Sequence, residues 1–239
     1  MSTRPTTTLL LAALAGFSGL LFADDPATQK IQVTHTETVP FPSAGRLRLK
    51  NSIGELTIQG WDRPDVEITT IKSTALAIAP AKRDKATREL DKVRIAAATQ
   101  GEDLVIATEF PRHRGWLPTW RRHPNTDFDL EYRIMVPRNA RIDVDHVRGE
   151  VHVDNLTSDV RVTDGNGTIT LQVPADGQYD VDARSKLGAV DSDLPGHENR
   201  AHWFGHGFVQ ATPAAHKLYL RVGFGDIVIL KMQKPVPLQ

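Results

Sequence analysis

The chain contains no cysteine. This absence excludes a disulfide framework, thiolate metal sites, cysteine nucleophiles and lipid attachment through an N-terminal cysteine. It is compatible with an oxidising compartment in which the fold does not depend on disulfides. Any metal site or nucleophile would have to come from other residue types.

The chain also has no net charge, because 29 basic residues balance 29 acidic ones. This balance argues against nucleic-acid binding. The sequence has no Gly-x-Ser-x-Gly elbow of a serine hydrolase and no glycine-rich phosphate loop ahead of a helix. We therefore expect no nucleic-acid partner, no cofactor and no enzymatic activity.

A long hydrophobic run is missing as well. The apolar stretch 9–22 has about 14 residues, whereas a transmembrane helix needs roughly 20. Arg4 precedes it, and Leu21-Phe22-Ala23 provides a cleavage site before Asp24. We predict a signal peptide over residues 1–23, with no membrane span after cleavage and export to the periplasm or the cell surface. The alternative is an uncleaved membrane anchor.

What the chain does contain is a repeated phrase of the form Gly-x-apolar-x-apolar. It begins at Gly149, Gly167 and Gly225, recurs at Gly188 with Ser192 in the last position, returns loosely at Gly207, and has an earlier copy at Gly54. In the C-terminal half the glycines are roughly 20 residues apart, a period typical of stacked β-coils that cannot bury their apolar faces alone. The repeats predict an all-β fold, a β-solenoid or β-roll of stacked two-strand rungs. Its inward column would contain Val151, Ile169, Val190 and Ile227.

The rest of the chain predicts one helix and a simple domain layout. Pro80 precedes a short helix over 81–92, in which Ala86, Leu90 and Val93 share one face. We expect an N-terminal lead segment at 24–44, a single β-solenoid domain at 45–233 and a proline-rich tail at 234–239. The glycine-rich stretch 164–167 is predicted to be a turn between two strands.

Three features together resemble a known family. They are an N-terminal signal, the phrase Gly-Glu-Leu-Thr-Ile-Gln-Gly-Trp-Asp-Arg-Pro-Asp-Val from Gly54 to Val66, and the strand Tyr132 to Pro137 followed by the repeats. The combination resembles the bacterial "putative adhesin" family of exported repetitive β-proteins, which is related to the toast-rack domains. The resemblance implies a right-handed β-solenoid on the cell envelope. It supplies no catalytic residues, because the family has none established.

The loop from Arg112 to His123 is the most unusual local sequence, with four arginines, two tryptophans and no acid. Arginine forks pair with phosphate or carboxylate, and tryptophan favours sugar faces or membrane interfaces. One interpretation is a binding site for an anionic partner. The other is a cap, in which the tryptophans cover the end of the core. The candidate binding residues are Arg112, Arg114, Trp116, Trp120, Arg121 and Arg122.

Two other sets of residues suggest chemistry less strongly. His197, His202 and His206 are close in sequence, but their spacing matches no short metal motif, so we predict no metal site. Aspartates recur along the repeats, and glycosidases use a pair of carboxylates. The sequence therefore predicts a non-enzymatic envelope scaffold or adhesin-like interaction module, with a protein, an anionic glycan or a lipid surface as its partner. The alternative is a polysaccharide-cleaving β-solenoid enzyme.

Overall fold

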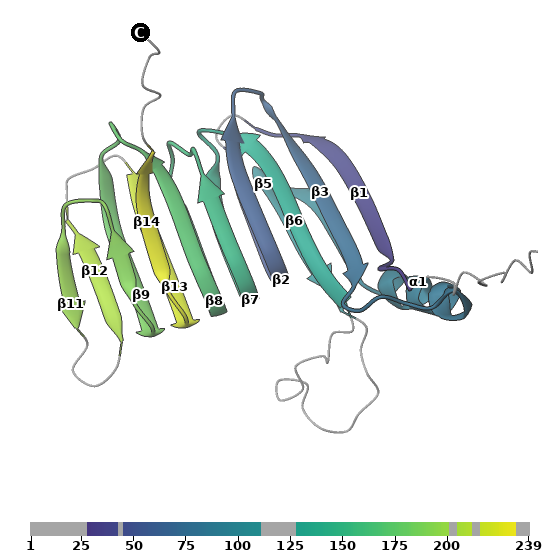
Figure 1. Cartoon of the computed structure of the whole chain (residues 1–239). Helices are drawn as coiled ribbons and strands as arrows, with labels where there is room; N and C mark the ends of the chain where they lie inside the picture. Colours follow the sequence, from purple (N-terminus) through teal and green to yellow (C-terminus); the bar gives the residue numbers. More distant parts are fainter. Residues whose placement is uncertain (1–27, 43–44, 111–127, 201–204, 212–215, 233–239) are drawn as a thin grey trace, which may run out of the picture.

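The computed structural model describes residues 28–42, 45–110, 128–200, 205–211 and 216–232. They form a mostly β protein with one short helix, as the sequence predicts, and the strands make one 14-stranded mixed sheet (Figure 1). The predicted signal peptide and the proline-rich tail lie outside the described residues. Within the described ranges, no helix is long and apolar enough to cross a membrane.

The elements follow one another along the chain in a simple order. They are β1 Gln32–Pro40, β2 Arg46–Trp61, β3 Asp65–Thr74, the 3-10 helix η1 Pro80–Lys82, α1 Arg83–Asp91, β4 Arg94–Gln100, β5 Asp103–Glu109, β6 Phe128–Pro137, β7 Arg141–Asp154, β8 Val160–Pro174, β9 Tyr179–Leu187, β10 Val190–Ser192, β11 His197–Arg200, β12 His206–Gln210, β13 His216–Phe224 and β14 Ile227–Met232.

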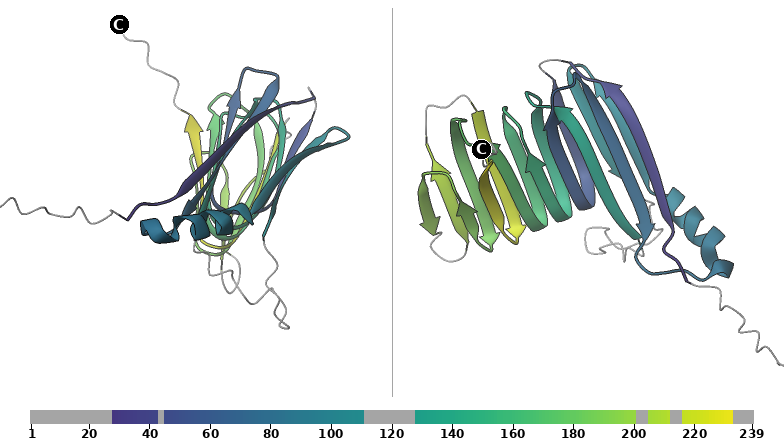
Figure 2. Two further views of the ribbon diagram at one scale, coloured as in Figure 1. Left: turned by 90° about the vertical axis from the view of Figure 1, so that its right-hand side faces the viewer. Right: turned by 45° about the horizontal axis from the view of Figure 1, so that its top comes forward.

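The sheet forms two walls because β2 and β8 each change one partner halfway along their length, while β7 pairs with both of them throughout. The first half of β2 pairs in parallel with β5, its second half pairs in parallel with β6, and both halves pair with β7. Likewise, β13 pairs in parallel with the first half of β8, and β14 pairs in parallel with its second half. We call the wall with β5, β13 and β9 the first wall, and the wall with β6, β14 and β10 the second wall. Apolar residues from both walls form one buried core, and the end-on view shows the walls facing each other (Figure 2).

Each change of wall takes place at a glycine, and these glycines stack. The column consists of Gly54, Gly149, Gly167, Gly225 and Gly188, all with positive φ. At Gly149 φ is 132°, and an added Cβ would lie 1.9 Å from the carbonyl oxygen of Gly54. Only glycine permits both this conformation and this close approach of neighbouring strands. The repeated glycine of the sequence therefore marks the bend between the walls.

Beside the glycine column lies the predicted column of apolar residues. Val151 pairs with Ile169 in the parallel ladder, and Ile227 lies between Ile169 and Val190. All four side chains are buried, while Thr170, one residue after Ile169, is on the outer face and only half-buried. The predicted alternation of inward and outward residues is confirmed at these positions.

The order of the repeats in space differs from their order in the chain. The ladder passes from β8 to β13 and only then to β9, so the last repeat is inserted between two earlier ones. The loose repeat at Gly207 is not in the glycine column, because β12 runs antiparallel to β9 and pairs Gly207 with Arg184. The repeats therefore do not stack in chain order beyond β8. The physical reason is that the β11–β12 hairpin occupies one edge of β9, so β13 can add only at the other edge.

Antiparallel strands form both ends of the sheet. At one end, β1 pairs with β3 and β3 with β6; at the other, β11 pairs with β12. The strand β1 comes from the segment that the sequence analysis treated as a polar lead. The predicted helix is confirmed as η1 and α1. Leu90 and Val93 are buried, and the Nζ of Lys72 donates hydrogen bonds to their carbonyl oxygens at 3.3 and 3.2 Å.

Candidate functional site

The six predicted binding residues, Arg112, Arg114, Trp116, Trp120, Arg121 and Arg122, lie outside the described residues. The structure describes only the base of their loop, where the rings of Phe110 and Phe128 stack with centroids 6.4 Å apart. Binding by this loop therefore stays a prediction.

The histidines considered as metal ligands do not come together in the described part of the chain. His197 is on β11 opposite Val209, and His206 is on β12 opposite Arg200, so the two lie at opposite ends of one hairpin. His202 lies outside the described residues. Among the described residues, no group of three histidine or acidic side chains is placed to hold a metal ion.

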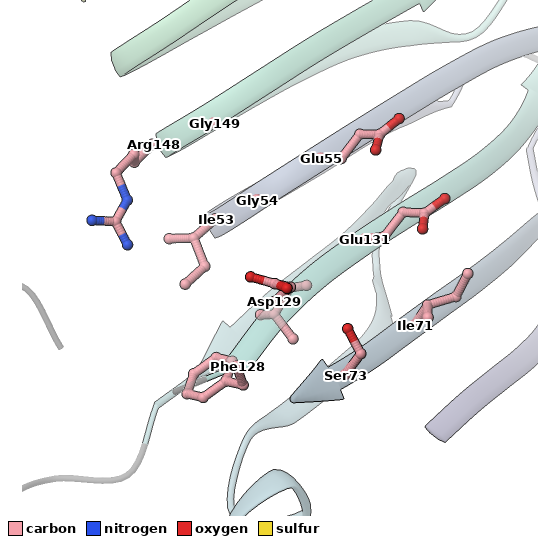
Figure 3. A pocket seen from close by; sticks show the side chains of 11 residues that line it. Ile53, Gly54, Glu55, Ile71, Ser73, Phe128, Asp129, Glu131, Arg148 and Gly149 are labelled. Atoms are coloured by element: carbon pink, nitrogen blue, oxygen red, sulfur yellow. The ribbon is translucent and has the colours of Figure 1, made fainter. Parts of the chain in front are cut away.

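A pocket of about 470 Å³ lies on the second wall, where β6, β2 and β7 run side by side (Figure 3). Glu55, Asp129 and Glu131 are among its lining residues, and Figure 3 shows Glu55 and Glu131 extending to the same side. Phe128 lines the pocket too, so the base of the loop that contains residues 112–123 borders it. The pocket therefore gathers carboxylates beside Phe128.

The carboxylates gather there because of the strand register. Glu55 on β2 pairs with Glu131 on one side and with Glu150 of β7 on the other. Like charges on neighbouring strands are destabilising unless they are offset. Basic groups offset two of the pocket's acids: Arg133 pairs with Glu131, and Lys30 lies 3.5 Å from Asp129.

A row of charged and aromatic side chains crosses the outer face of the first wall. We call this the charged row; its members are Asp103 on β5, Arg48 on β2, Asp143 on β7, Arg161 on β8, Tyr219 on β13, and Asp182 on β9. From Arg48 to Asp182 each member is the register partner of the next. The six strands lie side by side, so the row spans most of the first wall.

Direct contacts join the members of the charged row. Arg48 lies 3.5 Å from Asp103 and 3.6 Å from Asp143, and Arg161 lies 3.6 Å from the other oxygen of Asp143. The guanidinium of Arg161 also lies over the Tyr219 ring, 4.3 Å from its centroid.

The row ends in a small cluster on β13 and β9. Arg221 stacks over Tyr219 at 3.9 Å and forms an ion pair with Asp182, which also pairs with Arg184 at 3.0 Å. Exposed ion pairs each stabilise a fold by only about 0.2–1 kcal/mol. The main consequence of the row is a surface of alternating charge held in one arrangement by the ladder beneath it.

A second polar row is buried between the walls. Ser52, His146 and Asp164 occupy consecutive register positions on β2, β7 and β8, and all three are at most 4% exposed. The segment 164–167, predicted to be a turn, is part of β8. That prediction is wrong because no strand ends there: β8 bends at Gly167 but continues from its ladder with β13 into its ladder with β14.

Hydrogen bonds determine the tautomer of His146. Its Nε2 lies 3.2 Å from the carbonyl oxygen of Gly54, which can only accept, so Nε2 carries the proton. Its Nδ1 then accepts a hydrogen bond from the Ser52 hydroxyl at 2.7 Å. This pair has the composition of a nucleophile and its base. However, Ser52 is 0% exposed, so no substrate can reach it.

Burial shifts the two titratable members of this row in opposite directions. Desolvation lowers the pKa of His146 to about 4 and raises the pKa of Asp164 to about 6. Asp164 Oδ1 accepts a hydrogen bond from the backbone amide of Asn166 at 3.2 Å, while its buried Oδ2 has no hydrogen-bond partner.

The buried row was not predicted from the sequence, although a signal for it was present. His146 and Asp164 continue the inward alternation of Val144 and Val162 by one further step of two residues. Asp164 was nevertheless predicted to lie in a turn, and no position was predicted for His146. The charged row had no sequence signal of its own, because it depends on which strands become neighbours.

Comparison with known proteins adds information on the fold alone. No family model and no curated protein matches the chain. A solved structure of a putative cell adhesion protein from Clostridium sporogenes aligns with 84% of this chain and 100% of its own, with a TM-score of 0.50 and 15% identity. A putative adhesin from Bacteroides fragilis aligns with 86% of this chain and 99% of its own at 12% identity, but its TM-score of 0.23 carries no argument. The predicted resemblance to bacterial adhesin structures is confirmed as a structural match.

Proposed function

We propose that the protein is a non-enzymatic, exported interaction module of the bacterial cell envelope, with an adhesin-like or scaffolding role. We further propose that its architecture is a right-handed β-solenoid or β-roll. The stacked glycine column and the in-register apolar column support this description of the two walls. The fold likeness to a cell adhesion protein is compatible with the role.

The charged row is the observation that carries this proposal. Its arginines reach solvent, with Arg161 53% and Arg48 36% exposed, yet the parallel ladder sets their spacing. A surface whose side chains are already ordered loses less conformational entropy on binding. Arginine is also the basic residue best suited to forked contacts with carboxylate or phosphate. The row therefore fits an envelope component that bears such anionic groups.

Export is the second part of the proposal, and it rests on the predicted signal peptide at residues 1–23. Intact-mass measurement of the exported protein should show a new N-terminus at Asp24. A full-length chain retained in the inner membrane would contradict export as proposed and favour the membrane anchor.

Binding can be tested by incubating the exported protein with purified envelope fractions at increasing salt. Electrostatic contacts of an exposed row weaken as salt screens them, so the bound fraction should fall as ionic strength rises. Replacing Arg161 and Tyr219 together, as Arg161→Ser with Tyr219→Ala, should lower the bound fraction further. Arg133→Ser on the second wall is the matched control, because it removes an exposed arginine from an ion pair outside the row.

Equal binding by the row variant and the Arg133→Ser control would exclude the charged row as the contact surface. The melting temperature of the row variant must stay close to that of the control. This condition ensures that lost binding reflects the surface and not unfolding.

A second candidate function is glycan cleavage, and the pocket on the second wall is the observation that favours it. A glycosidase needs two carboxylates close to one scissile bond. Glu55 and Glu131 are register partners on adjacent strands and line the same pocket. Cleavage would also require that a sugar unit of the glycan binds in this pocket between the two carboxylates.

The two functions are separated by assaying hydrolysis of envelope polysaccharides. If this pocket cleaves glycans, both Glu55→Gln and Glu131→Gln should abolish hydrolysis. Glu150 lies outside the pocket lining, so the control Glu150→Gln should retain hydrolysis. Salt-sensitive binding without turnover supports the interaction module.

A further inference from the structure

The strand β1 forms one end of the sheet, and its outer edge pairs with no strand in the part of the chain that the structure describes. It is the terminal strand of the order β1-β3-β6, and β3 is its one strand neighbour among the described residues. The end-on view shows β1 facing the viewer along most of its length, with α1 at its N-terminal end (Figure 2). An unpaired strand nine residues long is a template for pairing with another strand.

The backbone groups on this open edge can be identified from the ladder to β3. Thr74 donates a backbone hydrogen bond to Ile31 at 2.9 Å, so this antiparallel pair is of the hydrogen-bonded kind. Hydrogen-bonded pairs alternate along an antiparallel ladder. The odd-numbered residues of β1 therefore face β3, and the even-numbered residues Gln32, Thr34, Thr36, Thr38 and Pro40 direct their backbone groups to the open edge.

The sequence of β1 is almost symmetric about Thr36. On either side of it the strand reads Val-Thr-His and Glu-Thr-Val, from Val33 to Val39. Two copies aligned antiparallel about Thr36 would place Val33 opposite Val39, and Thr34 opposite Thr38. The one pair that breaks the symmetry is His35 opposite Glu37, in which an imidazole N–H can donate a hydrogen bond to a carboxylate.

We propose that two copies of this chain associate through β1, antiparallel and centred on Thr36. The partner is a second copy because the strand is complementary to itself. Such pairing is isologous, so each contact occurs twice about a two-fold axis. The proposal does not depend on the proposed function, since it concerns a different surface from the charged row.

The direction of the backbone hydrogen-bonding groups on β1 agrees with a two-fold axis at Thr36. Thr36 directs its N–H and C=O to the open edge, so it can form a hydrogen-bonded pair with Thr36 of the second copy. Thr34 and Thr38 also direct theirs outward and would pair with each other. Pro40 lacks an N–H, but its carbonyl remains available to Gln32 of the second copy. The centre is thus compatible with the one proline of the strand.

The side chains agree as well. His35 and Glu37 fall in the pairs without hydrogen bonds, where side chains of opposite strands lie closest. Val33 and Val39 are half-buried, and Val39 packs against the core, so their pairing would extend apolar contact across the interface. On the other face, the Oγ1 of Thr36 lies 2.9 Å from that of Thr69, and the pairing would continue this row of threonines.

The absence of cysteine makes crosslinking a direct test. In the proposed dimer the two Thr36 Cα atoms are about 5.5 Å apart, within the range that a disulfide spans. Mild oxidation of the full chain carrying Thr36→Cys should give a disulfide-linked dimer. Thr38→Cys is the matched control, because residue 38 of one copy would lie about 14 Å from residue 38 of the other.

We expect at least about tenfold more linked dimer with Thr36→Cys than with Thr38→Cys. A mixture of Thr34→Cys and Thr38→Cys chains should link although neither chain links alone. Equal linking by the Thr36→Cys and Thr38→Cys chains would overturn the proposed centre.

A charge exchange tests the His35–Glu37 pair without crosslinking. The oligomeric state of each variant is measured by sedimentation. His35→Glu places two glutamates opposite each other and should shift the protein toward monomer. Adding Glu37→His again places a histidine opposite a glutamate and should restore the dimer. A monomer at all protein concentrations, or a double variant no better than the single one, would overturn the proposal. His35 and Glu37 would then act as charges that prevent edge pairing.

Discussion

His146 on β7 and Asp164 on β8 occupy the same register position inside the core, and burial reverses the usual order of their pKa values. The histidine has a pKa of about 4 and the aspartic acid a pKa of about 6. Between these values both side chains are neutral in the folded protein. In the unfolded chain, with ordinary values of 6.5 and 3.8, both would be charged over the same range.

The two groups have opposite effects on stability as pH changes. Between about pH 4 and 6, folded Asp164 holds a proton that the unfolded chain has lost, so its contribution to stability falls as pH rises. Between about pH 4 and 6.5, the unfolded chain holds a proton that folded His146 lacks, so the histidine's contribution rises with pH. Each effect amounts to about 3 kcal/mol. We predict that they largely cancel over this range.

The Asp164→Asn variant should reveal this cancellation. Its free energy of unfolding should rise by about 3 kcal/mol between pH 4 and 6.5, because only the histidine contribution remains. Urea denaturation at several pH values measures this slope. A variant with the same pH dependence as the unchanged protein would show that Asp164 does not titrate as described.

The hydrogen bond between Ser52 and His146 should contribute to stability and not to catalysis. In Ser52→Ala the buried Nδ1 of His146 loses its donor, which should cost about 1–3 kcal/mol. Thr57→Ala, on the outer face of the same strand, should change stability by less than about 0.5 kcal/mol. Equal melting temperatures for the two variants would contradict the assigned role of Ser52.

The glycine column should tolerate no side chain. Gly149→Ala combines a φ of 132° with a Cβ that would lie 1.9 Å from a backbone oxygen, so we expect a loss of more than about 3 kcal/mol. Gly101 has a φ of 64° but nothing within 4 Å of an added Cβ. Gly101→Ala should therefore cost only about 1–2 kcal/mol. Chemical denaturation of both variants separates the close approach from the backbone conformation.

The inward and outward positions of the repeats should respond very differently to charge. Ile169 is fully buried in the apolar column, so Ile169→Asp should cost several kcal/mol. Thr170→Asp changes the next residue, on the outer face, and should remain within about 0.5 kcal/mol of the original stability. Similar melting shifts for the two would mean that the register is wrong.

The local features of the fold could be predicted from the sequence. The alternation around Ile169 identified the buried column, and the spacing of Leu90 and Val93 identified the helix. In both cases the signal is a period of two or of about 3.6 residues, which depends only on neighbours along the chain.

The candidate sites could be predicted less well. Asp164 was placed in a turn because its polarity and the adjacent glycines outweighed the alternation that led to it. The pairing of Glu55 with Glu131 was not foreseen, since the two are far apart in the chain and meet only through the order of β2 and β6.

The sequence by itself determined the β class, the buried apolar column of the repeats and the glycines at which strands bend, because these follow from side-chain period and backbone sterics. Only the tertiary structure decided that Ile227 lies between Ile169 and Val190, and that Arg161 lies beside Tyr219. The physical reason is that every repeat presents nearly the same backbone edge and apolar face. Which strands become neighbours then depends on which edges remain open once the hairpin at the end of the sheet has formed.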